Sequence, residues 1–186
     1  RNGWTEDKYQ KKLANMATVI AEMAKENGCW HTVLGVCEIE NSKVLDDLTA
    51  HELIKDAGFE FVHHEGPDRR GIDVALLYRE SVLRRSSHSL KSLYHEGVRI
   101  PTRDMLHVCL ENGIGQNINM IVCHHPSKYG GSSESSGRRI SAMIALKELC
   151  DSLYIDDPGI PIVAMGDFND TPDGEQFNIL EGTLNN

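Results

Sequence analysis

The sequence has no long apolar run and no paired-cysteine motif. These absences argue against a membrane-spanning helix, a disulfide framework and a zinc site. No run approaches the roughly 18 apolar residues of a membrane-spanning helix. The five cysteines are an odd number, include no Cys-x-x-Cys and lie mostly inside apolar segments. We therefore expect small core residues rather than a disulfide framework or a zinc site.

Basic residues are fewer than acidic ones. The sequence has 19 Lys and Arg and 28 Asp and Glu, which gives a net charge of −9. Broad non-specific affinity for nucleic acid requires a basic surface, so the charge argues against it without excluding a nuclease that has a local basic groove. The apolar content of 40% and the charged content of 25% are ordinary for a soluble globular protein. We expect one domain over residues 1–186.

The start of the chain carries no signal peptide, and its first residue is Arg1 rather than an initiator methionine. We expect that a preceding segment is missing, so the compartment is unknown. A periplasmic or secreted location stays open if that segment carries a signal peptide. We expect no transmembrane segment, and we expect a monomer.

Apolar periodicity and turn residues predict intermixed helices and strands. Helices are expected over residues 6–27, 43–57 and 138–153, with a short one from near Pro172. Strands are expected over residues 30–37, 59–63, 72–78, 82–90, 105–110, 117–123 and 160–165. Asn112-Gly113 predicts a hairpin, whereas residues 91–102 and the Gly/Ser stretch 130–137 are expected to be loops. This order indicates a mixed sheet in an α/β or α+β fold with helices on the outer faces.

The most informative motif is Gly-Asp-Phe-Asn-Asp-Thr-Pro over residues 166–172, directly after an apolar strand. Side chains two residues apart on an extended segment point the same way, so Asp167 and Asn169 can face one site. An acid and an amide at a strand end suit magnesium-dependent phosphoryl transfer. The alternative is an Asx-turn that only closes the strand. Thr171 as N-cap and Pro172 at the first helical position then predict a helix.

Two other strand ends carry polar candidates. Glu38 and Glu40 follow an apolar strand and could hold a divalent cation, or could be a solvated strand end. His124 and His125 end another strand, where a histidine can donate to a phosphate oxygen or simply close a sheet edge. Adjacent strand residues face opposite sides, so at most one of the two histidines should point into a common site.

Asp73 is the one acid in an apolar strand, and burial of an unpaired acid is costly. We expect a structural ion pair with Arg70 or Arg103. The fork of Arg103 would also suit a phosphate. Further phosphate-binding candidates are Lys128, Arg138 and Arg139. His63-His64 and Asp46-Asp47 are interpreted as solvated surface.

Five segments in order carry a resemblance to a known family. They are Gly-Val-Cys-Glu-Ile-Glu-Asn at 35–41, Asp-Arg-Arg-Gly-Ile-Asp-Val-Ala-Leu-Leu-Tyr at 68–78, Thr-Arg-Asp at 102–104, Cys-His-His-Pro-Ser at 123–127 and the motif at 166–172. Together the chain resembles the endonuclease/exonuclease/phosphatase superfamily, the pancreatic-deoxyribonuclease-like fold. The Glu-Gly-Pro-Asp-Arg-Arg-Gly-Ile-Asp version is similar to secreted or periplasmic bacterial members of uncharacterised substrate. The resemblance implies an α+β fold, a four-layer αββα sandwich of two mixed sheets.

The resemblance also implies roles for individual residues. Glu38 would hold Mg²⁺, with Mn²⁺ as an alternative ion. Asp167 would orient or deprotonate the attacking water, with Asn169 beside it on the phosphate. His124 would hydrogen-bond the phosphoryl group, and Arg103 would help to bind the phosphate. The implied reaction is metal-assisted hydrolysis of a phosphodiester by in-line attack of water, as in a nuclease or a related phosphodiesterase.

The chain departs from the family pattern at both ends. The family's first strand should precede the opening helix, and its closing strands should carry an acid followed by histidine, yet no Asp-His dipeptide is present. We therefore expect a fragment that lacks roughly 60–90 residues of a complete domain and is inactive alone. The partner is a phosphoester substrate, nucleic acid included. Two alternatives are a non-catalytic phospholigand-binding module on the same fold, and transition-metal capture by His63-His64 with His124-His125.

Overall fold

The computed structural model describes residue 3, residues 5–128 and residues 132–181. The first element is α1 (Glu6–Asn27), which matches the expected helix. The Thr5 side chain accepts a hydrogen bond from the Lys8 backbone N–H and caps the first turn. Gly28 ends the helix with a φ of 69°, a left-handed conformation that glycine adopts without strain. The helix thus begins and ends where local capping chemistry dictates.

The strands form two main sheets. The first, with order β1-β3-β2, contains β1 (Val33–Ile39), β2 (Phe59–His63) and β3 (Asp73–Arg79). The second, with order β4-β7-β8-β9, contains β4 (Leu83–Lys91), β7 (Met105–Asn112), β8 (Asn117–His124) and β9 (Ile162–Asp167). The pairings within the first sheet are antiparallel, whereas the second sheet is mixed because β8 and β9 run parallel.

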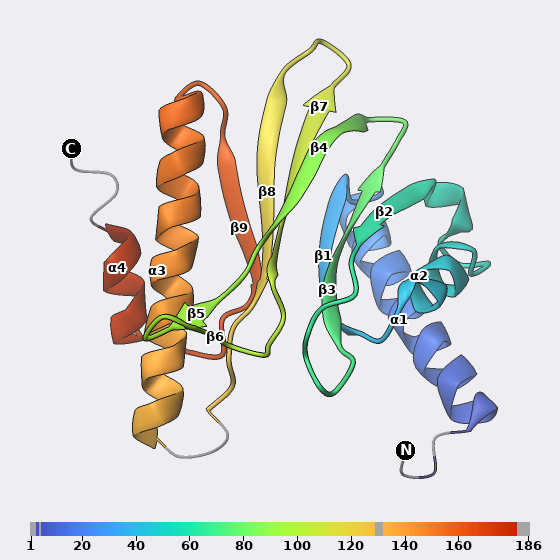
Figure 1. Ribbon diagram of the computed structural model, residues 1–186. Helices are drawn as coiled ribbons and strands as arrows, with labels where there is room; N and C mark the ends of the chain where they lie inside the picture. The colour runs from blue at the N-terminus through green and yellow to red at the C-terminus, as the bar shows by residue number, and fades with distance from the viewer. Residues whose placement is uncertain (1–2, 4, 129–131, 182–186) are drawn as a thin grey trace.

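Helices cover the outer faces of both sheets (Figure 1). The first sheet is covered by α1 and α2 (Ser42–Thr49), and the second by α3 (Ser132–Asp156) and α4 (Asn178–Glu181). The four-layer αββα sandwich implied by the resemblance is therefore confirmed. No helix within the described parts of the chain is long and apolar enough to cross a membrane.

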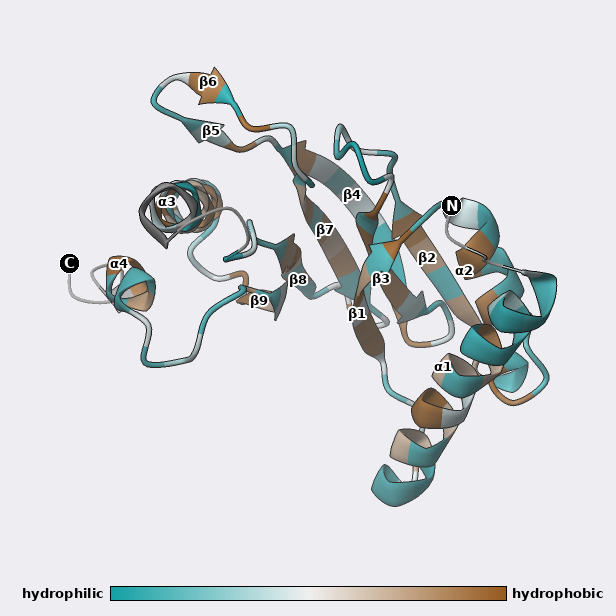
Figure 2. Ribbon diagram, turned by 90° about the horizontal axis from the view of Figure 1, so that it is seen from below, coloured by the Kyte–Doolittle hydropathy of each residue, from teal (hydrophilic) through white to brown (hydrophobic). Residues whose placement is uncertain are grey.

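Three apolar clusters hold the layers together. Leu13 and Ala17 of α1 belong to the cluster on the outer face of the first sheet. Leu76 belongs to the central cluster between the sheets, and Met143 to the cluster under α3. Figure 2 shows the hydrophobic colouring concentrated on the strands, while the outer surface of α1 is largely hydrophilic. Burial of these faces is the main favourable contribution to the fold.

Some sequence predictions differ from the structure. The helix expected over residues 43–57 is two elements, α2 and the 3₁₀ helix η1 (Lys55–Ala57). The Thr49 hydroxyl donates back to the Leu45 carbonyl, and His51 Nδ1 accepts the Leu53 N–H. Such local side-chain bonds compete with helix continuation.

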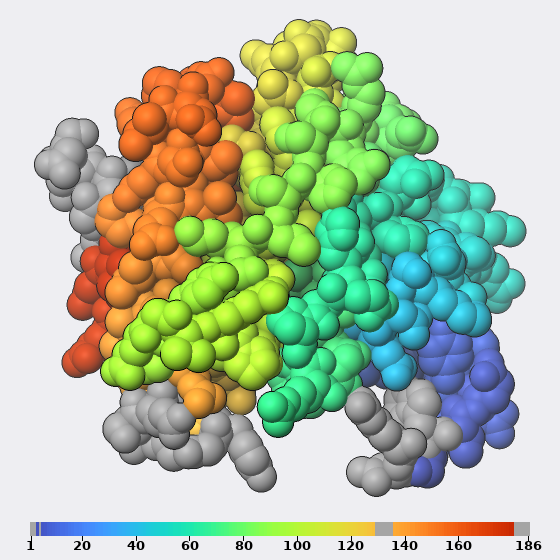
Figure 3. Space-filling view, in the orientation of Figure 1, coloured from blue at the N-terminus to red at the C-terminus, as the bar shows by residue number. Residues whose placement is uncertain are grey.

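The segment 91–102, expected to be a loop, contains the short strands β5 (Tyr94–His95) and β6 (Val98–Arg99). Glu96 and Gly97 both have positive φ, 49° and 77°, as a tight hairpin turn requires. His95 Nδ1 lies 2.8 Å from Ser141 Oγ on α3. Figure 3 shows this segment, in yellow-green, on the surface across the lower part of α3.

Two expectations near the C-terminal half also need correction. Residues 132–137 of the expected Gly/Ser loop belong to α3, whereas 129–131 lie outside the described residues. The helix expected from Pro172 is absent there. The chain turns instead, with Gly174 donating its N–H to Thr171 O, and η2 (Glu175–Phe177) follows. The hairpin expected at Asn112-Gly113 is confirmed by the antiparallel pairing of β7 with β8.

Candidate functional site

Strand ends from both sheets meet at one rim of the sandwich. In the parallel pair β8–β9, His124 stands opposite Asp167, the last residue of each strand. In the first sheet, Ile39 at the end of β1 pairs with Asp73 at the start of β3. The two sheets touch here, because Cys37 Sγ lies 3.5 Å from the carbonyl oxygen of Cys123. The register therefore brings the acid of β9, the histidine of β8 and the end of β1 to the same rim.

Glu38 is the extra residue of a β-bulge at the end of β1. The register skips it between Cys37 and Ile39, and its φ is 61°. A bulge re-aims the side chain relative to the regular strand. The Glu38 carboxylate is exposed and lines a groove of about 560 Å³ between α1 and the first sheet, together with Arg70. The strained backbone and the exposed acid at a groove make Glu38 a functional-site candidate.

His124 and Asp167 approach each other with 3.8 Å between Nε2 and Oδ2. The imidazole is buried, whereas the Asp167 side chain is 55% exposed and open to a ligand. Burial, and then the nearby Arg103 cation, lowers the pKa of His124 below its usual value, while Asp167 and Glu38 oppose the shift. His124 is therefore a neutral imidazole near pH 7.

His125 faces the opposite side, as the strand alternation predicts. Its ring packs edge-on against Phe168 with 5.1 Å between the ring centroids. Its two ring nitrogens have no hydrogen-bond partner among the residues that the structure describes. Burial, and then the charge of His124, lowers the pKa of His125 to about 4. Only one of the two adjacent histidines thus approaches the Asp167 carboxylate.

Asn169 holds the end of β9 in place. Its backbone N–H donates to Asp167 Oδ1 at 2.8 Å, so an Asx-turn is indeed present. Its φ is 52°, and its Nδ2 donates to the His125 carbonyl at 2.8 Å. Gly166 has a φ of 129°, and a Cβ there would lie 2.0 Å from Cys123 O. The Asx-turn is therefore part of the candidate site. Its hydrogen bond fixes Asp167 Oδ1 and leaves Oδ2 on a side chain that is 55% exposed.

Arg103 is buried behind the rim. Its Nη1 donates to Asp68 Oδ2 at 2.9 Å and its Nη2 donates to the His125 carbonyl at 3.0 Å. Arg70 also donates to Asp68, from its backbone N–H and from Nε. Burial raises the pKa of Asp68, but the hydrogen bonds from the two arginines outweigh it and lower the pKa to about 2. The structure shows Arg103 bracing the backbone of the site, and its contact with phosphate stays a prediction.

The sequence did not predict that Asp68 would pair with both arginines, or that Arg70 would lie at the groove beside Glu38. The guanidinium of Arg70 is 54% exposed and lies at the same groove as Glu38. An Asp followed two residues later by an arginine N–H is the Asx-turn signal in the loop sequence Asp-Arg-Arg-Gly. Sequence reasoning could therefore have placed Arg70, whereas the link from Asp68 to Arg103 spans 35 residues and has no local signal.

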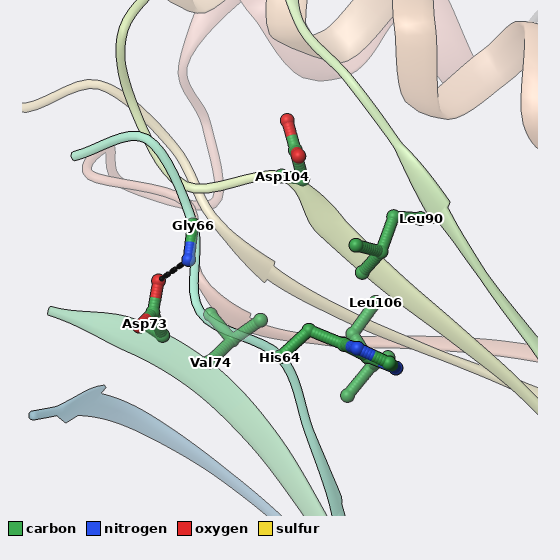
Figure 4. Close-up of a pocket in the computed structure, with 7 residues that line it drawn as sticks. All are labelled: His64, Gly66, Asp73, Val74, Leu90, Asp104 and Leu106. Carbon is green, nitrogen blue, oxygen red and sulfur yellow. Dashed lines mark hydrogen bonds between the residues drawn. The ribbon is translucent and has the colours of Figure 1, made fainter. Parts of the chain in front are cut away.

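Asp73 has other partners than expected. Both arginines proposed for it bind Asp68 instead, whereas Asp73 Oδ1 accepts the Gly66 N–H at 2.9 Å (Figure 4) and Oδ2 lies 3.5 Å from His63 Nε2. Burial raises the pKa of Asp73. The loop after β2 brings its own donors to Asp73, so the distant arginines are not needed.

His63 and His64 are not solvated surface, because the His63 side chain is 3% exposed and the His64 ring stacks on His88 at 4.8 Å. The one group of close metal-ligand atoms among the described residues does not include His64, His124 or His125, so the four histidines do not form the transition-metal site considered from the sequence. Of the other basic candidates, Lys128 and Arg139 both approach Asp170.

Glu38 suits a hard cation. Magnesium takes oxygen ligands and is usually held by one or two carboxylates, with waters and substrate phosphates completing its shell. Glu38 offers an exposed carboxylate at an open groove, and the Asp167 oxygen that the turn leaves exposed is of the same chemistry. The donor set at the rim therefore fits magnesium.

Comparisons with known proteins agree with this fold. The model of the Endonuclease/Exonuclease/phosphatase family matches residues 1–182. No curated protein matches the chain in sequence. The human Nocturnin catalytic domain with bound sulfate is similar with a TM-score of 0.71 and 15% identity, over 92% of this chain and 62% of that domain. The mannosyl-6-phosphatase of Bacteroides thetaiotaomicron has a TM-score of 0.69 and 16% identity, over 98% and 67%.

A third structure is ANGEL2, a 2′,3′-cyclic phosphatase in complex with adenosine-2′,3′-vanadate, with a TM-score of 0.68 and 15% identity, over 91% of this chain and 47% of that one. The chain thus spans less than two thirds of the Nocturnin domain and less than half of ANGEL2. At these identities the likeness shows the fold alone. The family model, however, covers nearly the whole sequence. The chain belongs to the Endonuclease/Exonuclease/phosphatase family.

Proposed function

We propose that the protein is a magnesium-dependent phosphoesterase that hydrolyses a phosphodiester by attack of water. The observation that carries this proposal is the β8–β9 register, which sets His124 beside Asp167 at the rim where Glu38 is exposed. Family membership supports the reaction class, and the neighbours named above include two phosphatases. Mn²⁺ is an alternative ion at the same oxygen donors.

Asp167 is proposed to orient the attacking water or to accept its proton. The Asn169 N–H holds Oδ1, which leaves Oδ2 for this task. Magnesium, held by Glu38, would supply positive charge that stabilises the phosphoryl oxygens. A carboxylate that has one oxygen fixed and the other exposed is oriented before the substrate arrives, which lowers the entropy cost of the reaction.

His124 is proposed to donate a hydrogen bond to the phosphoryl group. A neutral imidazole keeps one N–H, so it can donate without being charged. We assign that proton to Nε2, the nitrogen that faces Asp167. Arg70 is proposed to attract the phosphate at the mouth of the groove, and Asn169 to keep the end of β9 in register beside it. Arg103 would then help to bind the phosphate indirectly, because its hydrogen bond to the His125 carbonyl holds the backbone next to His124 in place.

The test is hydrolysis by the full-length protein with and without Mg²⁺. Plasmid DNA, bis-p-nitrophenyl phosphate and p-nitrophenyl phosphate separate a nuclease, a smaller-substrate diesterase and a monoesterase. Glu38→Gln removes the proposed ligand charge, and Glu80→Gln, an exposed glutamate at the other end of the first sheet, is the matched control. We expect Mg²⁺-dependent turnover that Glu38→Gln shifts to a Mg²⁺ requirement at least about tenfold higher.

Equal Mg²⁺ dependence in Glu38→Gln and in the wild type would contradict the assignment of Glu38. Hydrolysis of none of the three compounds, with phosphate binding retained, would support the non-catalytic binding module instead. On DNA, the slope of activity against salt adds a second readout, because contact with several phosphates makes binding fall steeply with salt.

A further inference from the structure

Three metal-ligand side chains lie together where β2 ends and β3 begins. One ligand atom from each of His63, Glu65 and Asp73 lies within 4.8 Å of the others, the one such group found among the described residues. His63 pairs with Ala75 in the antiparallel ladder, so His63 and Asp73 are diagonal neighbours on the same face of the sheet. The regular register of β2 with β3 therefore fixes two of the three ligands.

The two ligand atoms on the strands are buried and face each other at ion-pair distance. His63 Nε2 and Asp73 Oδ2 have no hydrogen-bond partner within the described parts of the chain, and their side chains are 3% and 5% exposed. They lie 3.5 Å apart. Two ligands of one tetrahedral metal, each bound at about 2.0–2.2 Å, lie about 3.3–3.6 Å apart. The spacing of His63 Nε2 and Asp73 Oδ2 is therefore the one that a metal ion bound to both atoms would require.

The surroundings of Asp73 orient its carboxylate toward His63. The Gly66 N–H binds Oδ1 at 2.9 Å, as Figure 4 shows, which leaves Oδ2 for the metal. A Cβ at position 66 would lie 2.6 Å from Asp73 Oδ1, so this approach requires glycine.

We propose that His63, Glu65 and Asp73 bind one divalent transition-metal ion of the Zn²⁺ or Mn²⁺ class. One imidazole and two carboxylates suit these ions, whereas Mg²⁺ and Ca²⁺ prefer oxygen ligands throughout. The site is separate from the Glu38 rim, because Glu38 and His63 lie on β1 and β2, on opposite sides of β3. The proposal does not depend on the proposed hydrolysis.

The ion would act as a clamp on the loop over residues 64–72. His63 and Asp73 lie at the two ends of this loop, which carries the Asp68 carboxylate that binds Arg70 and Arg103. Joining the ends reduces the conformational freedom of the loop. A metal at this position would therefore stabilise the network behind the rim without touching the substrate.

The test is Co²⁺ binding to the tag-free full-length protein, with excess Mg²⁺ present to occupy the oxygen-donor site at Glu38. Co²⁺ gives visible d–d absorption when it is bound, and Zn²⁺ competes for the same ligands. We expect one equivalent of Co²⁺ displaced by Zn²⁺. Glu65→Gln should weaken Co²⁺ binding at least about tenfold, while Glu60→Gln, an exposed glutamate on β2, should leave it unchanged.

Thermal unfolding gives the second readout. Zn²⁺ should raise the Tm of the wild type and of Glu60→Gln, and should raise the Tm of Glu65→Gln less. Glu65 is exposed, so its substitution keeps the fold even where His63→Gln does not. Absence of Co²⁺ uptake by the wild type, or equal uptake in Glu65→Gln, would overturn the proposal and leave His63 and Asp73 as a metal-free buried pair.

Discussion

Lowering the pH should destabilise the protein through His125. The ring is fully buried, and both of its nitrogens lack hydrogen-bond partners among the described residues. Its pKa is about 4 in the folded protein, against an ordinary value of 6.5. Between these values the unfolded chain binds a proton that the folded protein does not. Stability is therefore present above the ordinary pKa and is lost as the pH falls from 6.5 toward 4.

The size of the effect follows from the two pKa values. The difference of about 2.5 units corresponds to about 3.4 kcal/mol, at about 1.36 kcal/mol per unit. By the linkage relation, the free energy of unfolding falls by about 2.4 kcal/mol between about pH 7 and about pH 4.5. That is a large share of the roughly 5–15 kcal/mol that stabilises an ordinary domain. Asp68 does not contribute in this window, because its pKa of about 2 and its ordinary value of 3.8 both lie below it.

The assay is urea denaturation of the wild type and of His125→Phe at the two pH values. The phenyl ring keeps the edge-on contact with Phe168 and cannot titrate. The free energy of unfolding should fall by about 2.4 kcal/mol less in His125→Phe than in the wild type. Burial also lowers the pKa values of His124 and His88, so the comparison isolates His125. Equal losses in His125→Phe and the wild type would show that His125 does not cause this pH dependence.

Two further substitutions test the scaffold of the site by urea denaturation. Arg103→Met should lower the free energy of unfolding by about 3 kcal/mol, because it breaks a buried pair with Asp68. Arg70→Met, at a half-exposed guanidinium, should lower it by less than about 1 kcal/mol, and equal effects would contradict the brace assigned to Arg103. Gly166→Ala should cost at least about 2 kcal/mol, because its Cβ meets Cys123 O; a stability like the wild type's would contradict that close approach.

The sequence predicted those parts of the fold that depend on local patterns. The helix over residues 6–27 has a cap at each end, and the strand over residues 59–63 is bounded by Gly58 and by polar residues, so both match the structure. The hairpin at Asn112-Gly113 carries its own turn signal. The β5–β6 hairpin was missed because Glu96 is an unusual residue at positive φ.

The candidate site was predictable only in part. Each of Glu38, His124 and Asp167 lies at or next to the end of a strand, which the apolar runs before them indicate, and the sheet register brings His124 and Asp167 together. The partners of Asp68 and Asp73 were not predictable in the same way. The contact of Asp68 with Arg103 joins elements 35 residues apart, and the contacts of Asp73 depend on the conformation of the loop over residues 64–72, which no local sequence signal specifies in full.

The central claim is that Asp167 acts in hydrolysis at the rim. The most direct measurement is kcat of the full-length protein in saturating Mg²⁺ for the wild type, Asp167→Asn and Asp151→Asn. Asn at position 167 retains an oxygen that can accept the Asn169 N–H, and Asp151 is an exposed acid on α3 away from the rim. We expect kcat to fall at least about 100-fold in Asp167→Asn and less than about twofold in Asp151→Asn. Turnover by Asp167→Asn at the rate of the wild type would contradict this claim.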